Sequence, residues 1–412
     1  MRILWLSHLV PYPPKGGVLQ RAHYMLREVA RYHEVDLVAF NQKSLMAPFF
    51  PSLEVGLDEA EKVLGEFCRD TYFLDIPADK TKSGKYLMAL KSIFSSDPYT
   101  INWLKSKEYA QLVDRLLAEN EYDLVHFDTI SLLPYFDSIG SIPAVLDHHN
   151  IESHMLLRRV ENETNALKKW YYGQEGKRLE KFEKEYCPQF ALNITCSEVD
   201  ANRLQEIAVG CRAVEVPNGV DIDFFKADGS EHRPNSLIFV GRLNWYPNTA
   251  AVRFIAHQLW PALKAAIPDI NIDIIGANPP EDLVALSGED LDFRVHGFVD
   301  DIHSFMNTAA VYLCPITDGG GTKLKILDAL SMKKAIVAHP IACEGIRVSN
   351  GKNVMFAESV DDYVAAIKQL FKDGERRKAM GKEARALIEA EYSYTKIGKQ
   401  LSELYQRCVE SS

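Results

Sequence analysis

Residues 318–330 read DGGGTKLKILDAL, and they follow the short apolar run VYLCP at 311–315. Three glycines therefore join a predicted strand to a predicted helix. At about 100° per residue, the apolar side chains of this helix share one arc: Leu324, Ile326, Leu327 and Leu330. The opposite arc carries a hydroxyl, an ammonium and a carboxyl group, from Thr322, Lys325 and Asp328, together with Ala329. The pattern predicts a strand, a turn and an amphipathic helix.

Glycine at the start of this helix leaves backbone N–H groups accessible at the positive end of the helix dipole. The chemistry that suits this arrangement is a phosphate at the helix tip, a lysine beside it and an acid about two turns further along. A glycine-rich turn without a ligand is the alternative, and the segment alone fits both interpretations.

Length and composition exclude several classes of protein. The 412 residues are enough for two or three domains. A formal charge of −10 argues against general binding of nucleic acid. No apolar run approaches the roughly 18–20 residues of a membrane span, and the first residues, MRILWLSHL, fit a strand better than a signal peptide. Seven scattered cysteines without metal-binding spacing predict reduced thiols in the cytoplasm.

Strand-like and helix-like segments alternate along the whole chain, which predicts an α/β fold with parallel sheets. One series of strands begins with residues 3–6 and 35–40, and a second series begins with 192–195. Residues 151–190, which are strongly helical and charged, separate the two series. The sequence therefore predicts two doubly wound sheets with a boundary near residues 190–200.

Open parallel sheets bind ligands beyond the carboxyl ends of their strands, so the loops at those ends are the candidate sites. In the first half, Gly16 and Gly17 follow the first strand and would let the backbone approach a phosphate or a sugar, although a plain turn is the alternative. The loop DHHNIE at 147–152 follows another strand. A histidine there is suited to accept a proton or to hydrogen-bond a sugar hydroxyl near pH 7. The alternative is that one histidine caps the next helix while the other is solvated.

Two strand-end loops of the second half also carry polar groups. Residues 216–223, VPNGVDID, place Asp221 and Asp223 in a DxD triplet. Because a Pro-Asn-Gly turn precedes this triplet, a turn rich in Asp and Asn is the better interpretation, and no metal site is predicted. Arg242 ends the run FVGR just past a strand, where a guanidinium can bridge two phosphate oxygens. A surface arginine is the alternative.

Together these segments resemble the retaining, nucleotide-sugar-dependent glycosyltransferases of the GT-B fold, specifically family 4, also called glycosyl transferases group 1. The resemblance extends over nearly the whole chain. The most specific motifs are in the second half: VPNGVD at 216–221, FVGRL at 239–243, HGFVDD at 296–301, GGGTKLKILDALSMKKAIV at 319–337 and ACEG at 342–345. The first half matches less rigidly, through YPPKGG at 12–17 and DHHNIES at 147–153.

The resemblance implies two Rossmann-like domains with parallel sheets that face a central cleft. Residues 1–192 would bind the acceptor, residues 193–392 would bind the nucleotide sugar, and a final helix at 393–412 would cross back to the first domain. It also implies a metal-independent, hexosyltransferase-type enzyme that retains the anomeric configuration. No cofactor is expected, because the nucleotide sugar is itself a substrate. The expected acceptor is a glycan or a lipid-linked molecule of bacterial surface polysaccharide or glycoconjugate assembly.

The family pattern implies roles for particular residues. Arg242, Lys325 and the amides of residues 320–322 would stabilise the negative charge that builds on the departing diphosphate. Asp328 would hold the ribose hydroxyls. His149 would orient the donor sugar or stabilise its oxocarbenium-like centre. The remaining donor contacts would come from Gly16, Gly17, Gly320, Gly321, Thr322, Phe298 and Val299.

Two positions depart from the family pattern. The family has two glutamates eight positions apart near this helix, whereas the second position here is Asp328. The first is either replaced by Gly320 or supplied by Asp318, which would then hold the donor sugar. The lysine expected shortly after Gly-Arg is missing from NWYPNTAA, so Lys323 or Lys325 would supply that charge. A non-catalytic relative is therefore an open alternative.

Other classes of function make different demands on the sequence. A nicotinamide-dependent dehydrogenase would show GxGxxG after its first strand, and PPKGGVLQR lacks that pattern. A sugar-nucleotide epimerase would share the two-domain fold, and it would act without an acceptor. A carbohydrate-binding or partner-binding module would bind the donor without turnover.

One segment of the first domain is both basic and apolar. Its lysines and its apolar residues are Lys80, Lys82, Lys85 and Lys91, with Tyr86, Leu87, Met88, Leu90 and Ile93. Such a segment can rest on anionic lipid and bring the enzyme to a lipid-linked acceptor, although a solvated helix face is the alternative. The predicted location is the cytoplasm, with peripheral contact at the inner face of the membrane.

Overall fold

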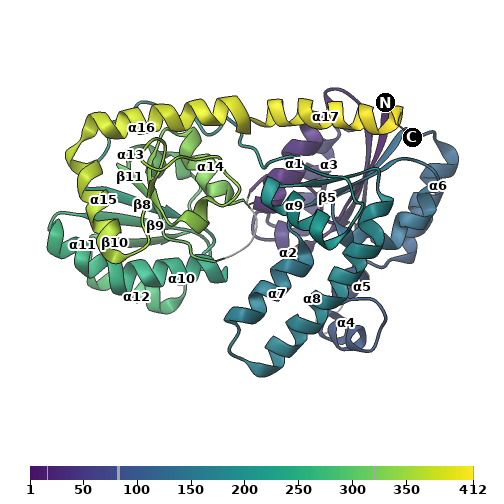
Figure 1. Cartoon of the computed structure of the whole chain (residues 1–412), viewed down its shortest axis with the longest axis horizontal. Coiled ribbons are helices and arrows are strands. Elements are labelled where there is room, and N and C mark those ends of the chain that lie inside the picture. Colours follow the sequence, from purple (N-terminus) through teal and green to yellow (C-terminus); the bar gives the residue numbers. More distant parts are fainter. Residues whose placement is uncertain (16, 81–83, 319–321, 412) are drawn as a thin grey trace. The chain divides into compact units, whose positions relative to one another are not determined.

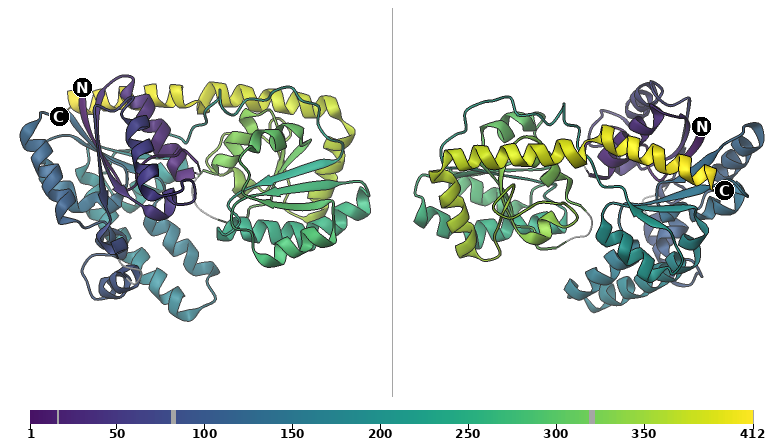
Figure 2. Two further views of the ribbon diagram at one scale, coloured as in Figure 1. Left: turned by 180° about the vertical axis from the view of Figure 1, so that it is seen from behind. Right: turned by 45° about the horizontal axis from the view of Figure 1, so that its top comes forward.

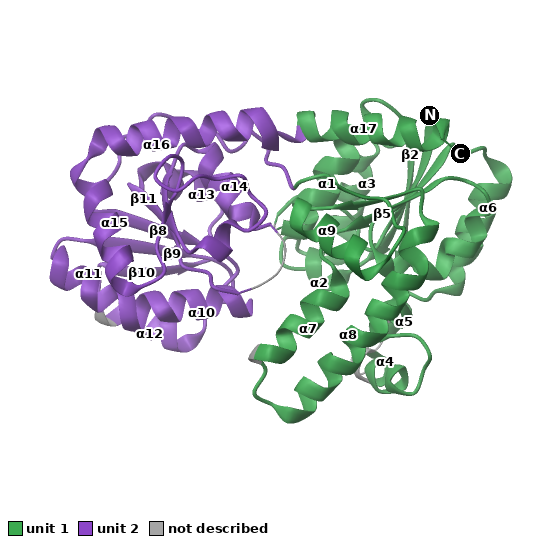
Figure 3. Cartoon of the chain, in the orientation of Figure 1, with its two compact units in different colours: residues 1–217, 395–412 green, residues 218–394 purple. Residues whose placement is uncertain are grey.

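The computed structural model describes residues 1–15, 17–80, 84–318 and 322–411 (Figure 1). The chain forms two compact units, one of residues 1–217 with 395–412 and the other of residues 218–394 (Figure 3). Each unit is built on its own parallel sheet, with helices on both faces (Figure 2). The predicted α/β fold with two parallel sheets is therefore confirmed.

The sheet of the first unit has seven strands in the order β3-β2-β1-β4-β5-β6-β7. Their bounds are β1 (Arg2–Ser7), β2 (Glu34–Asn41), β3 (Asp70–Asp75), β4 (Leu124–Phe127), β5 (Ala144–His148), β6 (Leu192–Thr195) and β7 (Ala213–Glu215). The chain winds outward from β1 in one direction and then from β4 in the other. The strand order reverses between β1 and β4, which is where open α/β sheets bind ligands.

The helices of the first unit connect these strands, except for α17, which is the last element of the chain. They are α1 (Gly17–Ala30), α2 (Lys43–Met46), α3 (Leu53–Leu64), α4 (Gly84–Ile93), α5 (Tyr99–Trp103), α6 (Lys107–Glu119), α7 (Glu152–Asn162), α8 (Ala166–Tyr186), α9 (Glu198–Ile207) and α17 (Tyr394–Glu410). Short 3₁₀ helices are η1 (Pro77–Lys80), η2 (Ile130–Ile139) and η3 (Cys187–Gln189). α7 and α8 pack against each other as a helical hairpin (Figure 1).

The sheet of the second unit has six strands in the order β10-β9-β8-β11-β12-β13. Their bounds are β8 (Ser236–Val240), β9 (Asn271–Ile275), β10 (Phe293–Gly297), β11 (Val311–Cys314), β12 (Ala335–Ala338) and β13 (Met355–Phe356). The α-helices are α10 (Tyr246–Phe254), α11 (Trp260–Ala266), α12 (Glu281–Glu289), α13 (Ile302–Thr308), α14 (Leu324–Ser331), α15 (Val360–Lys372) and α16 (Gly374–Leu387). The other helices are η4 (Ile255–Leu259), η5 (Pro340–Cys343) and η6 (Ile388–Tyr392).

The boundary between the units differs from the predicted one. The sequence pattern assigned the strand at 192–195 to the second sheet, but β6 pairs with β5 and β7 pairs with β6, so both strands extend the first sheet. The first unit therefore continues to Pro217 before the second begins at Asn218. Both sheets are made of short apolar parallel strands, and a strand's own sequence does not identify the sheet that it joins.

Helix α14 supplies part of the core of the second unit. Its predicted apolar residues Ile326, Leu327 and Leu330 are fully buried, as expected. Ala329, which was placed on the opposite arc, is also fully buried. The helix contacts both α16 and η6, so more of its circumference is covered than the amphipathic pattern indicated.

Two further features concern the cysteines and the lengths of the helices. All seven cysteine side chains are buried, and no disulfide joins any of them in the described part of the chain. Among the described residues, no helix combines the length and the apolar character needed to cross a membrane.

Helix α17 returns the end of the chain to the first unit. The Oγ atom of Ser402 lies 2.7 Å from Nε2 of His33, and the hydroxyl of Tyr405 lies 2.7 Å from Nδ1 of His126. Gly398 faces α1, where its backbone approaches the buried side chain of Glu28. Close packing of two helices at a glycine leaves no room for a larger side chain.

The substitution Gly398→Ala tests this packing. The new methyl group would overlap the Cβ atom of Glu28, so we expect the free energy of unfolding to fall by about 1–3 kcal/mol. Gly288→Ala is the matched control, because Gly288 is exposed in α12 with nothing within 4 Å of the added methyl group. That change should stabilise the protein by about 0.5–1 kcal/mol. Urea unfolding measures both, and a stabilising Gly398→Ala would contradict the packing of α17 on α1.

Candidate functional site

Three neighbouring strands of the first unit end in polar residues at one edge of the sheet. β1 lies beside β4, and β4 lies beside β5. The residues at or just beyond their carboxyl ends are His8 after β1, Asp128 after β4 and His149 after β5. The reversal of strand order between β1 and β4 therefore brings these three side chains together.

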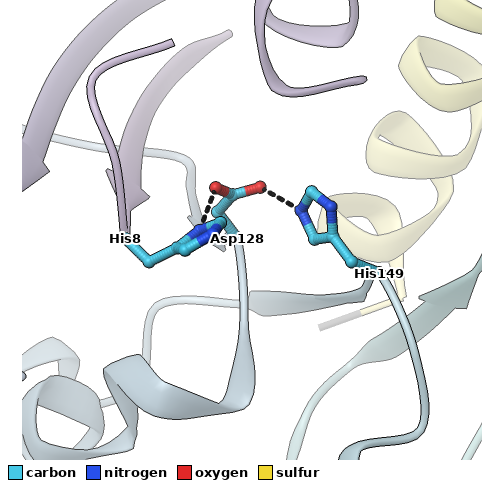
Figure 4. A group of neighbouring side chains, drawn as sticks. All are labelled: His8, Asp128 and His149. Atoms are coloured by element: carbon cyan, nitrogen blue, oxygen red, sulfur yellow. Dashed lines mark hydrogen bonds and ion pairs between the residues drawn. The ribbon is translucent and has the colours of Figure 1, made fainter. Parts of the chain in front are cut away.

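Asp128 is the centre of this group (Figure 4). One of its carboxylate oxygens lies 2.9 Å from Nε2 of His149, and the other lies 2.8 Å from Nδ1 of His8. The second oxygen also accepts a hydrogen bond of 2.9 Å from the hydroxyl of Ser7. The Asp128 side chain is 1% exposed, whereas those of His8 and His149 are 12% and 11% exposed. A buried carboxylate thus supports two imidazoles that lie closer to solvent.

The charges of this group depend on one another. Burial raises the pKa of Asp128, but the neighbouring His149 and His8 overcome that effect and hold the pKa well below its usual value. Burial lowers the pKa of His149, but Asp128 overcomes that effect and raises it. The carboxylate therefore stays charged near neutral pH, and His149 is more easily protonated than a free histidine.

Asp147 and His148, which precede His149, have structural partners. The guanidinium of the buried Arg21 donates two hydrogen bonds to Asp147, at 2.9 and 3.1 Å, and one to the carbonyl of Val216 at 3.1 Å. His148 turns into the core, where its Nε2 lies 3.1 Å from the side-chain oxygen of Asn193. Of the two adjacent histidines, His149 is therefore the one that joins Asp128.

The glycine loop after β1 is only partly described. Gly17 is the first residue of α1 and is exposed, and Gly16 lies outside the described residues. The predicted approach of these two backbones to a ligand remains a prediction.

In the second unit, three adjacent strands also end together, and a glycine either ends the strand (Gly297 in β10) or directly follows it (Gly241 after β8, Gly276 after β9). The amide of Gly241 donates to the carbonyl of Ile275 at 2.9 Å, and the amide of Gly276 donates to the carbonyl of Gly297 at 2.8 Å. A methyl group on Gly276 would overlap the carbonyl oxygen of Gly241. Gly297 has a φ of 68°, a conformation that glycine adopts without strain. The backbones at this edge are therefore packed more closely than side chains would permit.

Lys325 of α14 reaches this edge. Its ammonium donates a hydrogen bond of 2.5 Å to the side-chain oxygen of Asn248 and lies 5.0 Å from the ring centre of Phe239. The amide of Asn248 in turn donates to the carbonyl of Arg242 at 2.8 Å. Asn248 thus connects the Lys325 ammonium to the loop that carries Arg242.

Lys325 and Asp328, one turn apart on α14, both have shifted pKa values. The pKa of Lys325 is lowered to about 8, chiefly by burial and also by the nearby Lys323, although Cys314 and Asp328 oppose the shift. Burial raises the pKa of Asp328 to about 8, and Lys325 opposes that shift. Burial of charge without full compensation is a common feature of sites that bind charged ligands.

Other predicted donor contacts lie around α14 and β10. The helix begins at Leu324 with Lys323 as its N-cap residue, so Thr322 precedes the helix instead of opening it. Gly320 and Gly321 lie outside the described residues, between Asp318 and Thr322.

The side chains after β8 and β10 differ in exposure. Arg242, just past β8, is exposed. Phe298, just past β10, is 54% exposed, and Val299 packs against the core.

The DxD triplet forms the predicted turn. One side-chain oxygen of Asp221 accepts hydrogen bonds from the backbone amides of Asp223 and Phe224, at 3.1 and 3.0 Å. This Asx-type turn occupies the carboxylate of Asp221 and confirms the interpretation based on turn chemistry.

Sequence reasoning did not identify three of the residues at these edges: His8, Asp128 and Asn248. The first two directly follow strands, but they point to a site only once those strands are known to be neighbours in the sheet. Asn248 gave no such signal, since it lies in α10 and acts by linking a backbone carbonyl to Lys325.

His8, Asp128 and His149 also form one of two groups in the described part of the chain whose spacing would suit a metal ion. In the present arrangement, each carboxylate oxygen of Asp128 is at hydrogen-bonding distance from an imidazole nitrogen. The three side chains therefore satisfy one another as a hydrogen-bonded network. The absence of a catalytic metal remains a prediction.

The two parallel α/β sheets give the chain a GT-B-like fold. Sucrose-phosphate synthase from Thermosynechococcus elongatus superposes with a TM-score of 0.70 and 14% identity, over 100% of each chain. At that identity the likeness establishes the fold alone.

Two family models identify the protein family. The model described as glycosyl transferases group 1 matches residues 234–373, and the model described as glycosyltransferase family 4 matches residues 89–224. The chain therefore belongs to the group 1, or family 4, glycosyltransferases.

Two curated relatives add detail. A phosphatidyl-myo-inositol mannosyltransferase from Mycolicibacterium smegmatis is 27% identical over 215 residues, which are 50% of this chain and 55% of the relative. The chain thus matches about half the length of that relative. An uncharacterized 44.6 kDa protein in the cps region of Klebsiella pneumoniae is 20% identical over 96% of this chain and 97% of its own length.

The two lysines near the start of α14 give a sharp test of the site. Lys325 contacts Asn248 beside the Arg242 loop, whereas Lys323 precedes the first turn. We expect Lys325→Ala to lose much more nucleotide affinity and turnover than Lys323→Ala, at matched thermal stability. Equal losses would mean that both lysines share the charge, and a loss confined to Lys323→Ala would contradict the assignment.

Proposed function

We propose that the protein transfers a sugar from a nucleotide-sugar donor to a glycan or lipid-linked acceptor with retention of the anomeric configuration. The observation that carries this proposal is the Lys325 ammonium beside the Arg242 loop, at the edge where three strands end at or just before a glycine. Family membership supports the same chemistry.

The cations of this edge suit the departing diphosphate. Cleavage of the anomeric C–O bond builds negative charge on the phosphate oxygens, and fixed positive groups lower the barrier most when they already point at that charge. The Lys325 ammonium is held by Asn248 before any ligand arrives. Its hydrogen-bond partner is a neutral amide, so a diphosphate would supply the anion that compensates the buried charge.

The remaining donor contacts follow from position. Asp328, one turn beyond Lys325, binds the ribose hydroxyls, and Asp318 binds the donor sugar. The backbone at Phe298 and Val299, just past β10, contacts the base. In the first unit, His149 hydrogen-bonds a sugar hydroxyl and orients the reacting ring.

The relatives support a choice of acceptor. One relative is named for the transfer of mannose to phosphatidyl-myo-inositol, and another is encoded in a cps region. We infer that the acceptor is a lipid-linked or growing glycan of surface polysaccharide or glycoconjugate assembly.

Two experiments, done one after the other, test this function. A thermal-shift screen of UDP, GDP, dTDP, ADP and CMP identifies the base, because a ligand that binds only the folded state raises the melting temperature. Nucleotide sugars with that base are then incubated with lipid-linked and free glycan acceptors, and the anomeric configuration of the product is read by NMR. Inversion contradicts retention, epimerisation of the donor favours an epimerase, and binding without turnover favours a non-catalytic module.

Arg242 gives a further mutational prediction. If its guanidinium stabilises the leaving phosphate, Arg242→Ala should lower turnover by roughly 10²–10³-fold with the fold intact. The matched control is Arg253→Ala, which removes an exposed arginine paired with Asp282 in the same unit. Activity of Arg242→Ala within a few-fold of the wild type, like that of the control, would remove Arg242 from the site.

We also predict that catalysis needs no divalent metal. The DxD carboxylate of Asp221 is occupied by a turn, and the Asp128 oxygens are occupied by imidazoles. Turnover should therefore be unchanged after extensive treatment with EDTA. Complete loss of activity in EDTA that magnesium or manganese restores would overturn this prediction.

Peripheral contact with anionic lipid is proposed for α4. Its residues Leu87 and Leu90 are 52% and 56% exposed, and Phe94 just beyond the helix is 86% exposed. Lys91 adds positive charge to this segment. The predicted Lys82 lies outside the described residues, as do the side chains of Lys80, Lys85 and Tyr86.

The substitution Leu90→Asp tests this contact. It should weaken binding to anionic liposomes at low salt, because it removes apolar area and adds repulsion. The control is Val209→Asp, which changes an apolar side chain that is 85% exposed elsewhere in the first unit. Failure of the wild type to bind liposomes, or equal binding by both variants, would reject α4 as the contact.

A further inference from the structure

The two histidines beside Asp128 each use only one ring nitrogen in the network. His8 contacts the carboxylate through Nδ1, and His149 contacts it through Nε2. The other nitrogens, Nε2 of His8 and Nδ1 of His149, make no hydrogen bond to the described residues. Among the described residues, neither nitrogen is a buried polar atom that lacks a hydrogen-bond partner. Each ring therefore has an inner nitrogen on Asp128 and an accessible outer nitrogen.

The carboxylate determines which nitrogen carries the proton. An ionised carboxylate accepts hydrogen bonds but cannot donate them, so the inner nitrogen of each neutral imidazole is the one that bears hydrogen. The outer nitrogens of His8 and His149 are then both acceptors. The rings lie with their centres 5.4 Å apart and nearly perpendicular, at 72°. Two acceptor nitrogens thus lie on neighbouring rings, just beyond the carboxyl ends of β1 and β5.

Acceptors on two neighbouring rings match the chemistry of a carbohydrate. A sugar ring carries hydroxyl donors on neighbouring carbons, and a rigid pair of acceptors can bind two of them at once. A site that hydrogen-bonds a substrate hydroxyl leaves its own polar groups unpaired when that hydroxyl is absent, which makes such contacts selective.

We propose that His8 is a second substrate-contacting residue, and that Asp128 is a positioning residue that presents His8 and His149 together to two hydroxyl groups of one sugar ring. This inference rests on the proposed function and adds two residues to it. The ring is either that of the donor sugar or that of the acceptor, and the experiments below distinguish these sources.

Two substitutions of His8 separate contact with substrate from support of Asp128. The amide of Asn occupies the position of Nδ1, so His8→Asn keeps a donor to Asp128 and deletes the outer nitrogen. The longer side chain in His8→Gln places its amide near the position of the outer nitrogen and no longer donates to Asp128. We expect His8→Asn to lower kcat/KM about tenfold, the effect of one lost hydrogen bond, at nearly unchanged melting temperature.

His8→Gln should recover part of that loss despite lower stability. His8→Asn within twofold of the wild type would show that His8 only supports Asp128. A rate that simply follows stability across the His8 variants would point the same way.

The substitution Asp128→Asn tests the positioning role through pH. Titratable and charged groups surround His149 from several elements. They are Asp128 just after β4, His126 in β4, Asp147 in β5, His8 just after β1, Arg21 in α1 and Glu152 at the start of α7. Of these groups, Asp128 contributes most to keeping the pKa of His149 raised.

The sign of the expected shift follows from the charges. If neutral His149 is the active acceptor, the acidic limb of the kcat/KM profile reports its protonation. Removal of the negative charge leaves burial to lower the pKa, so the acidic limb should move to lower pH in Asp128→Asn. The maximal rate should fall by about 10²-fold, because the rings are no longer held in one orientation. A fall in stability with an unmoved acidic limb would show a merely structural role and overturn the proposal.

Donor hydrolysis without acceptor identifies the ring that is bound. If the pair binds the donor sugar, His8→Asn slows hydrolysis and raises KM for the donor. If it binds the acceptor, hydrolysis is unchanged and KM for the acceptor rises.

A separate experiment tests the histidine pair if the proposed function is wrong. If the wild type turns over no nucleotide sugar, the pair is tested by the ¹⁵N shifts of its two imidazoles during titration with a panel of methyl glycosides. Shifts that disappear in His8→Asn support the sugar site without the transferase activity. An absence of shifts in the wild type overturns the paired site as well.

Discussion

The common direction of parallel strands is the constraint from which both candidate sites follow. Because every strand of such a sheet runs the same way, the residues after the strands meet at one edge, whatever their separation in sequence. In the first unit this brings together His8, Asp128 and His149. His8 and Asp128 are 120 residues apart in the sequence, and Asp128 and His149 are 21 residues apart. In the second it brings Arg242 and the β10 terminus to the edge that Lys325 reaches.

Buried charge is compensated differently at the candidate site of the first sheet and at that of the second. In the first unit the Asp128 carboxylate is fully partnered by two imidazoles and a serine hydroxyl, so its pKa is held well below the usual value and the network is fixed before a ligand binds. In the second unit the Lys325 ammonium has a neutral amide as its hydrogen-bond partner, and burial lowers its pKa to about 8. The compensated Asp128 carboxylate is suited to hold its neighbours rigidly, and the uncompensated Lys325 ammonium is suited to bind an anionic ligand.

The sequence predicted the elements well and their associations less well. Alternation of strands and helices was enough for two parallel sheets, and the apolar arc of α14 was correct at Ile326 and Leu327. The domain boundary moved to Pro217 because the pairing of β6 with β5 depends on tertiary contacts that no local pattern records. Asp128 was missed for a similar reason, since its importance appears only when β1, β4 and β5 are known to be neighbours.

Hydrogen–deuterium exchange with and without a saturating nucleoside diphosphate tests the central claim most directly, since it needs neither the acceptor nor turnover. The account predicts that the diphosphate slows exchange in peptides covering residues 239–248 and 322–328, because it joins the Arg242 loop to the start of α14. Residues 360–372 of α15 serve as the internal reference and should be unchanged. Binding that leaves 239–248 and 322–328 unprotected would contradict the assignment of the donor site to this edge.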